Sequence, residues 1–205
     1  MTEEALITAI ETRLGKKVDL LENQWGRFLL FDAPQSPGTK VLSTVGLSLY
    51  EMPVHEKHKG EEQCELYFHL PSYWNLEATD NPNFNWVFYW LNRLKHFVIE
   101  HHTWFGHGHT MPCGKEKKPI SATMLQNAFM LTRPLELHID LAPFTVEESQ
   151  VHFLAVIPLF GDELDYKMAK GTVKLMEKFS HVQVTEKLDD YRKSVVRSKW
   201  SLFRK

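Results

Sequence analysis

The sequence has few cysteines and no long apolar run. Cys64 and Cys113 are its only two cysteines. They are too few for the disulfide framework of a small secreted domain, although one disulfide bond between them is an alternative. The first residues, Met1 to Ala5, are acidic where a secretion signal would be basic, and no apolar stretch has the length that spans a bilayer. We therefore expect a cytoplasmic protein with reduced thiols and no membrane association.

A strong net charge is also missing. The formal net charge is −2, so nucleic-acid binding would need a local basic patch, and none occurs before the last twenty residues. The stretch from Glu186 to Lys205 carries seven basic and three acidic side chains. This short basic C-terminal tail is interpreted either as a solvated terminal helix or as a place for an acidic partner. Nucleic-acid binding through it is the least favoured function.

Enzyme and cofactor motifs are mostly absent. The chain has no glycine-rich phosphate loop, no G-x-S-x-G, no H-E-x-x-H and no paired C-x-x-C. It also has no internal repeat, low-complexity tract or linker. With 43% hydrophobic and 24% charged residues, 205 residues are enough for one sizeable core. We expect residues 1–205 to form a single domain that ends in the basic tail.

Three segments have the periodicity of amphipathic helices. The first follows the capping residue Thr2 and ends at Gly15. The second helix follows Pro82, and Trp86, Trp90 and Phe97 lie off its apolar stripe. Either the rest of the chain covers this helix on two sides, or the helix presents these aromatic residues to a partner. Cover by the chain is favoured. The third runs from Asp162, a capping residue, to Phe179, and we interpret Gly171 inside it as a site of close backbone packing. The stripe of the second helix consists of Phe84, Val87, Phe88, Leu91, Leu94 and Val98.

Alternating and apolar runs predict the strands. Glu136 to Leu141 alternates apolar and polar residues, as in a sheet with one wet face, whereas Val151 to Ile157 is continuously apolar and belongs in the middle of a sheet. The polar stretch from Glu51 to Glu62 predicts a surface loop with solvated His55 and His58. The fold class is therefore α+β: a single-domain α/β sandwich with a mixed, largely antiparallel sheet covered by helices. The expected strands are Trp25 to Phe31, Lys40 to Leu47, Glu65 to Leu70, Asn127 to Thr132, Glu136 to Leu141 and Gln150 to Pro158.

One loop, residues 106–113, is rich in possible ligands. His107 and His109 form a His-x-His pair that could place both rings on one side for zinc, and His101, His102 and Cys113 lie near them in the sequence. Cys113 beside His109 also suggests a thiol nucleophile, but no third group is identifiable. A turn that exposes some imidazoles and buries one by hydrogen bonding is favoured over both, so we assign no catalytic residue, metal or cofactor. A metal-dependent protein or enzyme using this loop is the alternative function.

A series of short motifs runs in order from about Phe28 to Arg192. No motif is specific alone, but the ordered series resembles the suppressor of fused-like domain family, as a compact bacterial-type member without the additional C-terminal domain of the animal protein. The motifs are Ser43 to Ser48, Met52-Pro53, Glu65 to Pro71 with Trp74, Gly108-His109-Thr110, Pro119-Ile120, Ile157-Pro158-Leu159 with Glu163-Leu164, and Gly171.

The resemblance implies a mixed α/β sandwich without established enzymatic activity. The animal protein is a scaffold that binds a zinc-finger transcription factor of the hedgehog pathway, and bacterial members resemble immunity proteins that neutralise toxins. We therefore expect a non-enzymatic protein-binding domain whose partner is a toxin domain. Its groove would be lined by Trp74 and Trp104, with His109, Thr110 and Glu163 fixing the partner's orientation. The alternative for each tryptophan is that it closes the core at a helix end.

Overall fold

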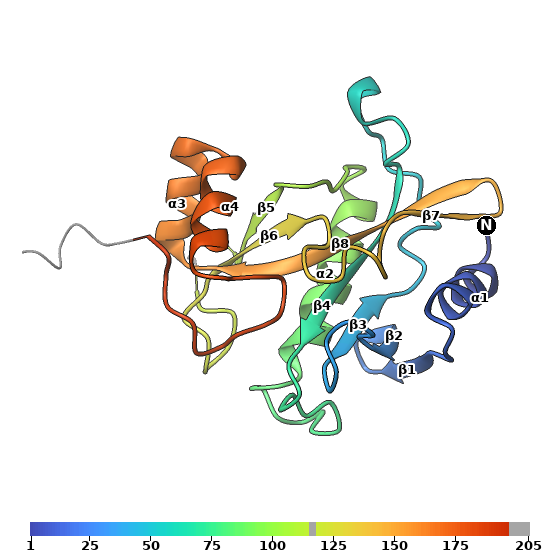
Figure 1. Cartoon of the computed structure of the whole chain (residues 1–205), viewed down its shortest axis with the longest axis horizontal. Coiled ribbons are helices and arrows are strands. Elements are labelled where there is room, and N and C mark those ends of the chain that lie inside the picture. Colours follow the sequence, from blue (N-terminus) through green and yellow to red (C-terminus); the bar gives the residue numbers. More distant parts are fainter. Residues whose placement is uncertain (115–117, 197–205) are drawn as a thin grey trace, which may run out of the picture.

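A mixed sheet organises the molecule (Figure 1). The computed structural model describes residues 1–114 and 118–196, which form eight strands in the order β1-β2-β3-β4-β8-β6-β5, with β7 paired to the first residues of β8. The central pair, β4 and β8, is parallel and the other pairs are antiparallel. The α+β class and the central position of β8 are confirmed. The strands are β1 (Asp19–Asn23), β2 (Gly26–Asp32), β3 (Lys40–Thr44), β4 (Gln63–Leu70), β5 (Thr110–Pro112), β6 (Ala128–Thr132), β7 (Phe144–Val146) and β8 (Ser149–Leu159).

Helices cover both faces of this sheet (Figure 1). Alternate residues of β4 point to opposite faces: Phe68 packs in the core under α2, and Tyr67 packs in the core under α1, α3 and α4. Among the described residues, no helix has both the length and the apolar character needed to cross a bilayer. The helices are α1 (Glu3–Leu14), the 3-10 turn η1 (Glu56–His58), α2 (Trp86–Glu100), α3 (Gly161–Lys170) and α4 (Thr172–His181).

Local signals place the first two helices correctly. Thr2 Oγ1 accepts a hydrogen bond from the Ala5 N–H at 3.1 Å, and Gly15 ends α1 in the left-handed conformation. The buried face of α2 contains the predicted stripe from Val87 onward. Trp86 is buried as well, as the favoured alternative predicted, whereas Trp90 and Phe97 are only half-buried. The chain therefore covers this second side of α2 in part.

The predicted strand at Glu136 to Leu141 is wrong, because this segment forms turns. The backbone N–H groups of residues 135–137 donate to the buried carboxylate of Glu186 at 2.9 to 3.0 Å, so they are not available to a neighbouring strand. Leu137 and Leu141 are buried while Ile139 between them is 59% exposed. The apolar residues therefore meet the core at a spacing of four, not two.

The predicted helix from Asp162 to Phe179 is wrong in its continuity, because α3 and α4 are separate helices that meet at Gly171. Gly171 has φ 86° and ψ 165°, and a Cβ added to it would have no heavy atom within 4 Å. Gly171 is therefore needed for its backbone conformation. Our interpretation of it as a site of close packing is wrong. The capping position also differs, since the residue that precedes α3 is Phe160.

The C-terminal segment turns back onto the sheet, where it is drawn in red in Figure 1. The Leu188 N–H donates to the His69 carbonyl oxygen at 2.8 Å, and Lys187 forms a parallel bridge with His69 at the end of β4. Residues 186–196 are therefore no solvated terminal helix. Residues 197–205 of the predicted tail, and residues 115–117 of the charged stretch before Pro119, lie outside the described part of the chain.

Candidate functional site

Trp104 lies at the centre of a cluster of imidazole rings that come from two loops. Its ring centroid is 4.3 Å from that of His109, 4.6 Å from that of His58 and 6.0 Å from that of His55. Trp104, His58 and His109 are each half-buried, while His55 is exposed. The prediction that His58 is simply solvated is therefore wrong, since it packs on Trp104. We call these four residues the Trp104 cluster; Thr110, which begins β5, directly follows it.

The loop that carries Trp104 is anchored to β6 and packs closely against the start of α4. The Gly108 N–H donates to the Leu131 carbonyl oxygen at 2.7 Å, and a Cβ added to Gly108 would lie 2.7 Å from Thr172 Oγ1 at the start of α4. Its φ of 85° also favours glycine. The glycine in Gly108-His109-Thr110 thus lets the loop approach α4 closely. This contact fixes the side of the loop that presents His109.

The ligand-type side chains of residues 106–113 are not brought together. His107 Nδ1 accepts a hydrogen bond from the Arg133 N–H, whereas His109 faces Trp104; burial lowers the pKa of both histidines. Burial raises the pKa of the Cys113 thiol to about 12, which disfavours the thiolate that a nucleophile or ligand needs. Within residues 1–114 and 118–196, no three His, Cys, Asp or Glu side chains are placed to hold a metal ion.

Trp74 lies apart from the Trp104 cluster, in the core. Only 8% of it is exposed, its Nε1 donates to the Phe84 carbonyl oxygen at 3.2 Å, and its ring centroid lies 5.6 Å from that of Trp86 in an edge-to-face contact. This is the geometry of a tryptophan that closes the core at the start of a helix, the alternative given for it above.

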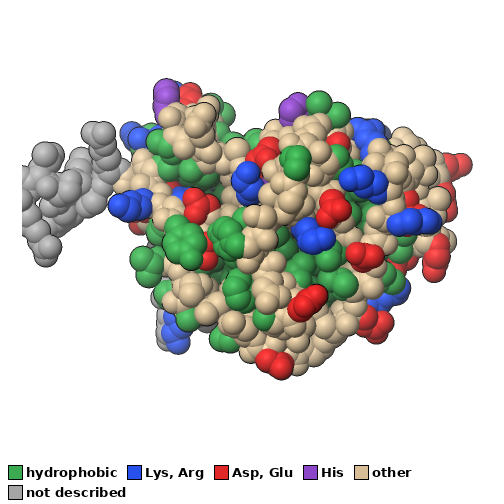
Figure 2. All heavy atoms as spheres, turned by 60° about the horizontal axis from the view of Figure 1, so that its bottom comes forward, with side chains coloured by type: hydrophobic (Ala, Val, Ile, Leu, Met, Phe, Trp, Pro, Cys, Tyr) green, Lys and Arg blue, Asp and Glu red, His purple; other side chains and the backbone are tan. Residues whose placement is uncertain are grey.

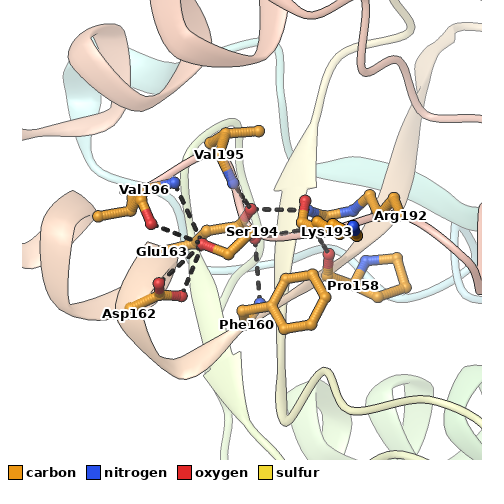
Figure 3. Close-up of polar contacts among 9 residues, drawn as sticks. All are labelled: Pro158, Phe160, Asp162, Glu163, Arg192, Lys193, Ser194, Val195 and Val196. Atoms are coloured by element: carbon orange, nitrogen blue, oxygen red, sulfur yellow. Dashed lines mark hydrogen bonds and ion pairs between the residues drawn. The ribbon is translucent and has the colours of Figure 1, made fainter. Parts of the chain in front are cut away.

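Glu163 is also internal (Figure 3). Its side chain is 0% exposed, and its two carboxylate oxygens lie 2.6 and 2.7 Å from the two terminal nitrogens of Arg192. It also accepts hydrogen bonds from the backbone N–H groups of Phe160 and Val195, each at 3.0 Å. Arg192 in turn donates to the Pro158 carbonyl oxygen at 2.6 Å. Glu163 therefore fastens the C-terminal segment to β8 and α3 instead of facing a partner.

A second buried carboxylate, Glu65 in β4, holds the loop after β3. It accepts hydrogen bonds from the hydroxyl of Thr44, from the backbone N–H of Leu47, and from both the N–H and the hydroxyl of Ser48. Burial raises the pKa of Glu65. The motif residues 43–48 and Glu65 thus form one internal hydrogen-bond network. A glutamate inside the apolar run of β4 was the signal for it in the sequence.

Sequence reasoning missed a groove beside the C-terminal segment, which we call the C-terminal groove. Its volume is about 700 Å³, and Pro71, Tyr73, Leu188 and Tyr191 are among its lining residues. Tyr73 is 48% and Tyr191 82% exposed, with ring centroids 6.3 Å apart. Figure 2 brings the lower side of Figure 1 forward and shows hydrophobic side chains gathered between charged ones in its left half. Exposed tyrosines beside a groove suit contact with another protein.

The fold is shared with solved structures at low sequence identity. The Sufu chain in the Sufu–Fu complex matches with a TM-score of 0.66 and 15% identity, over 96% of this chain and 93% of that one. A SUFU homologue from Neisseria gonorrhoeae matches with a TM-score of 0.63 and 13% identity, over 96% and 97%. Drosophila Suppressor of Fused matches with a TM-score of 0.64 and 16% identity, over 98% of this chain but 51% of that one, so this chain spans about half its length.

The sequence gives the family assignment. A comparison with curated proteins finds no match. The family model described as Suppressor of fused protein (SUFU), however, matches residues 26–193, which is most of the chain and includes the Glu65 network, the Trp104 cluster and the ion pair between Glu163 and Arg192. The chain therefore belongs to the suppressor of fused protein family.

Proposed function

We propose that this protein is a cytoplasmic, non-enzymatic protein-binding domain, and that its partner is a toxin domain that it neutralises. The observation that carries the proposal is the half-buried ring of Trp104, which contacts the rings of His58 and His109. A protein-binding role is supported by the matched relative in the Sufu–Fu complex. The toxin as partner is supported only by the resemblance of this chain to bacterial members of the family, which in turn resemble immunity proteins.

The Trp104 cluster has the properties of a contact surface. Tryptophan is enriched among the residues that contribute most binding energy at protein interfaces. Because neighbouring rings already hold Trp104 in place, a partner loses little affinity to ordering it. His109 and Thr110 lie next to it and supply polar groups. In this proposal Trp74 and Glu163 act indirectly, by closing the core and fastening the C-terminal segment.

Co-expression tests the proposal. We expect the protein to rescue cells from a toxin encoded beside its own gene, and the purified pair to bind. Trp104→Ala should weaken that binding, whereas Leu20→Ala, at a 42% exposed position in β1 on the opposite edge of the sheet from β5, should not. Absence of both rescue and binding with every neighbouring toxin would overturn the toxin as partner.

The alternative, a metal-dependent protein or enzyme using residues 106–113, stays a prediction. Metal analysis of protein purified without a histidine tag tests it. A stoichiometric metal that is lost when His107 and His109 are substituted would favour this alternative over the protein-binding role.

A further inference from the structure

The outward side of α2 carries aromatic residues that neither the core nor the Trp104 cluster accounts for. Tyr89 is 44% exposed, and Trp90 and Phe97 are half-buried. Trp25, from the turn between β1 and β2, is half-buried and stacks on Phe88 of α2 with ring centroids 6.0 Å apart. Trp25, Trp90 and Phe97 pack against the core while part of each side chain stays exposed, and Tyr89 contacts the ring of Trp90. We call this the α2 outer face.

Three hollows lie along the α2 outer face. One of about 370 Å³ lies between Trp25, Tyr89 and Trp90. A second of about 260 Å³ lies between Trp90, Phe97 and the edge strand β5. A third of about 270 Å³ lies along α2 itself, between Tyr89 and Phe97. The fifteen residues of α2 extend for roughly 22 Å at 1.5 Å per residue, so the hollows form a surface long enough for a segment of another protein.

The walls of these hollows are already ordered by contacts behind them. The ring of Trp90 meets that of Phe129 in β6 edge to face, with centroids 5.0 Å apart. The ring of Phe97 is stacked between Phe105, at 6.2 Å, and His101, at 4.4 Å. A ligand would therefore not have to immobilise these side chains when it binds, which favours affinity.

Arg93 gives this apolar surface a charge preference. It is exposed and lines two of the hollows, and among the interactions of the described residues it has neither a hydrogen bond nor an ion pair. The other charged or titratable side chains in the hollows are His96, Glu100 and His101, and Glu100 lies 3.8 Å from His96. Arg93 thus places a guanidinium beside the apolar wall formed by Trp90 and Phe97, and a carboxylate is the group that best complements it.

We propose that the α2 outer face binds a protein segment with a carboxylate flanked by apolar side chains. The carboxylate pairs with Arg93, and the apolar side chains enter the hollows beside Trp90 and Phe97. This inference rests on the proposed protein-binding role and adds a surface that shares no residue with the Trp104 cluster. The occupant is an acidic amphipathic segment, because a basic one would bring a like charge against Arg93.

Two synthetic 18-residue peptides test the inference. They share leucine and phenylalanine at helical spacing and differ only in aspartate or lysine at the central polar positions. With the full-length protein, calorimetry should show that the aspartate peptide binds about tenfold more tightly than the lysine peptide. Arg93→Glu should reverse this preference, since it exchanges the sign of the charge on an exposed side chain. Lys16→Glu, which makes the same charge reversal at an exposed position after α1, serves as the control and should leave both affinities unchanged.

Three results would each overturn the inference: no binding of the aspartate peptide, equal affinity for the two peptides, or an unchanged preference in Arg93→Glu. An unchanged circular dichroism spectrum and urea midpoint for Arg93→Glu will show that this exposed substitution leaves the fold intact. The outcome of the toxin co-expression experiment does not depend on the outcome of the peptide experiment. Rescue by the protein with no peptide preference would leave the toxin proposal standing and overturn this one.

Discussion

Arg192 and Glu163 form a bidentate ion pair that is almost completely removed from solvent, with side-chain exposures of 8% and 0%. The guanidinium also lies over the rings of Phe160 and Phe179, 4.9 and 5.4 Å from their centroids. The pair joins the C-terminal segment to the start of α3 (Figure 3). Glu163, which we had placed in a partner-binding groove, therefore belongs to the contact that holds the C-terminal segment against the rest of the fold.

Loss of either partner in this pair should destabilise the protein strongly. Arg192→Ala leaves the Glu163 carboxylate buried without its counter-ion, and we expect the free energy of unfolding to fall by about 3–5 kcal/mol in urea denaturation. Lys193→Ala, at the exposed neighbouring position, is the control and should change it by less than about 0.5 kcal/mol. Equal urea midpoints for Arg192→Ala and the wild type would show that the pair does not fasten the segment.

Gly171 and Gly15 should respond differently to substitution by asparagine. Gly15 is in the left-handed helical region, with φ 64° and ψ 21°, which asparagine tolerates. Gly171, with φ 86° and ψ 165°, is in a region that is essentially restricted to glycine. We expect thermal or urea unfolding to show a loss of about 1–3 kcal/mol for Gly171→Asn and a clearly smaller loss for Gly15→Asn. Similar losses at both positions would contradict the conformational role of Gly171.

The buried His69 should make stability depend on pH. Its Nε2 lies 2.7 Å from Thr39 Oγ1, and burial lowers its pKa although Glu136 and Glu186 oppose the shift. Because the folded state favours the neutral ring, this stabilisation is complete above the usual histidine pKa of about 6.5 and is lost as the pH falls through the lowered value. Urea unfolding between pH 7.5 and 5 should show a slope of at most about 1.4 kcal/mol per pH unit from this group.

Two histidine variants identify the source of that slope. His69→Gln should flatten it, whereas His181→Gln, at an exposed position, should leave it as in the wild type. A slope that survives in His69→Gln would assign the pH dependence to other groups.

The two candidate tryptophans should separate stability from binding. Trp74→Ala removes a ring from the core and should cost about 3–5 kcal/mol of unfolding free energy. Trp104→Ala removes a ring that is only half-buried and should cost less stability, but about 2 kcal/mol or more of binding energy if the Trp104 cluster is the contact surface. Urea denaturation and calorimetry with the neighbouring toxin measure the two effects. Loss of binding for Trp74→Ala at a temperature where it stays folded would restore Trp74 to the binding surface.

The Glu65 network should be more sensitive to substitution than the nearby, half-buried carboxylate of Glu62. Glu65→Ala leaves the N–H groups of Leu47 and Ser48 buried without an acceptor, and each such group costs about 1–3 kcal/mol. Glu62→Ala is the matched control, because within the described part of the chain the Glu62 carboxylate accepts a hydrogen bond only from the Gly60 N–H, in the turn before β4. Urea denaturation should show a loss several times larger for Glu65→Ala than for Glu62→Ala.

Much of the fold was predictable because it depends on residues close together in the sequence. Thr2 and Gly15 define the ends of α1, the apolar run of β8 indicates a central strand, and the stripe of α2 indicates its buried face. The same local patterns were misleading where distant groups compete. The alternation in Glu136 to Leu141 is genuine, but the carboxylate of Glu186, about fifty residues later, takes the N–H groups that a strand would have paired.

The candidate site was predictable only in part, for a similar reason. Sequence neighbours such as Trp104, His109 and Thr110 do lie together, and the ordered motifs correctly indicated the family. Whether a given tryptophan or glutamate faces solvent or the core depends on what packs over it, and no local pattern contains that information. Trp74 and Glu163 are buried by residues from other elements, and His58 joins Trp104 from a separate loop.

Local sequence patterns therefore predict the α+β class, the family, and those strands and helices whose caps and periodicity are local. Three features follow from tertiary packing alone: Glu163 pairs with Arg192, Glu186 holds the segment after β6, and α2 leaves aromatic side chains and Arg93 on its outer face. The physical reason is that burying a charged group requires partners from several elements at once, and these partners meet only when the chain has folded.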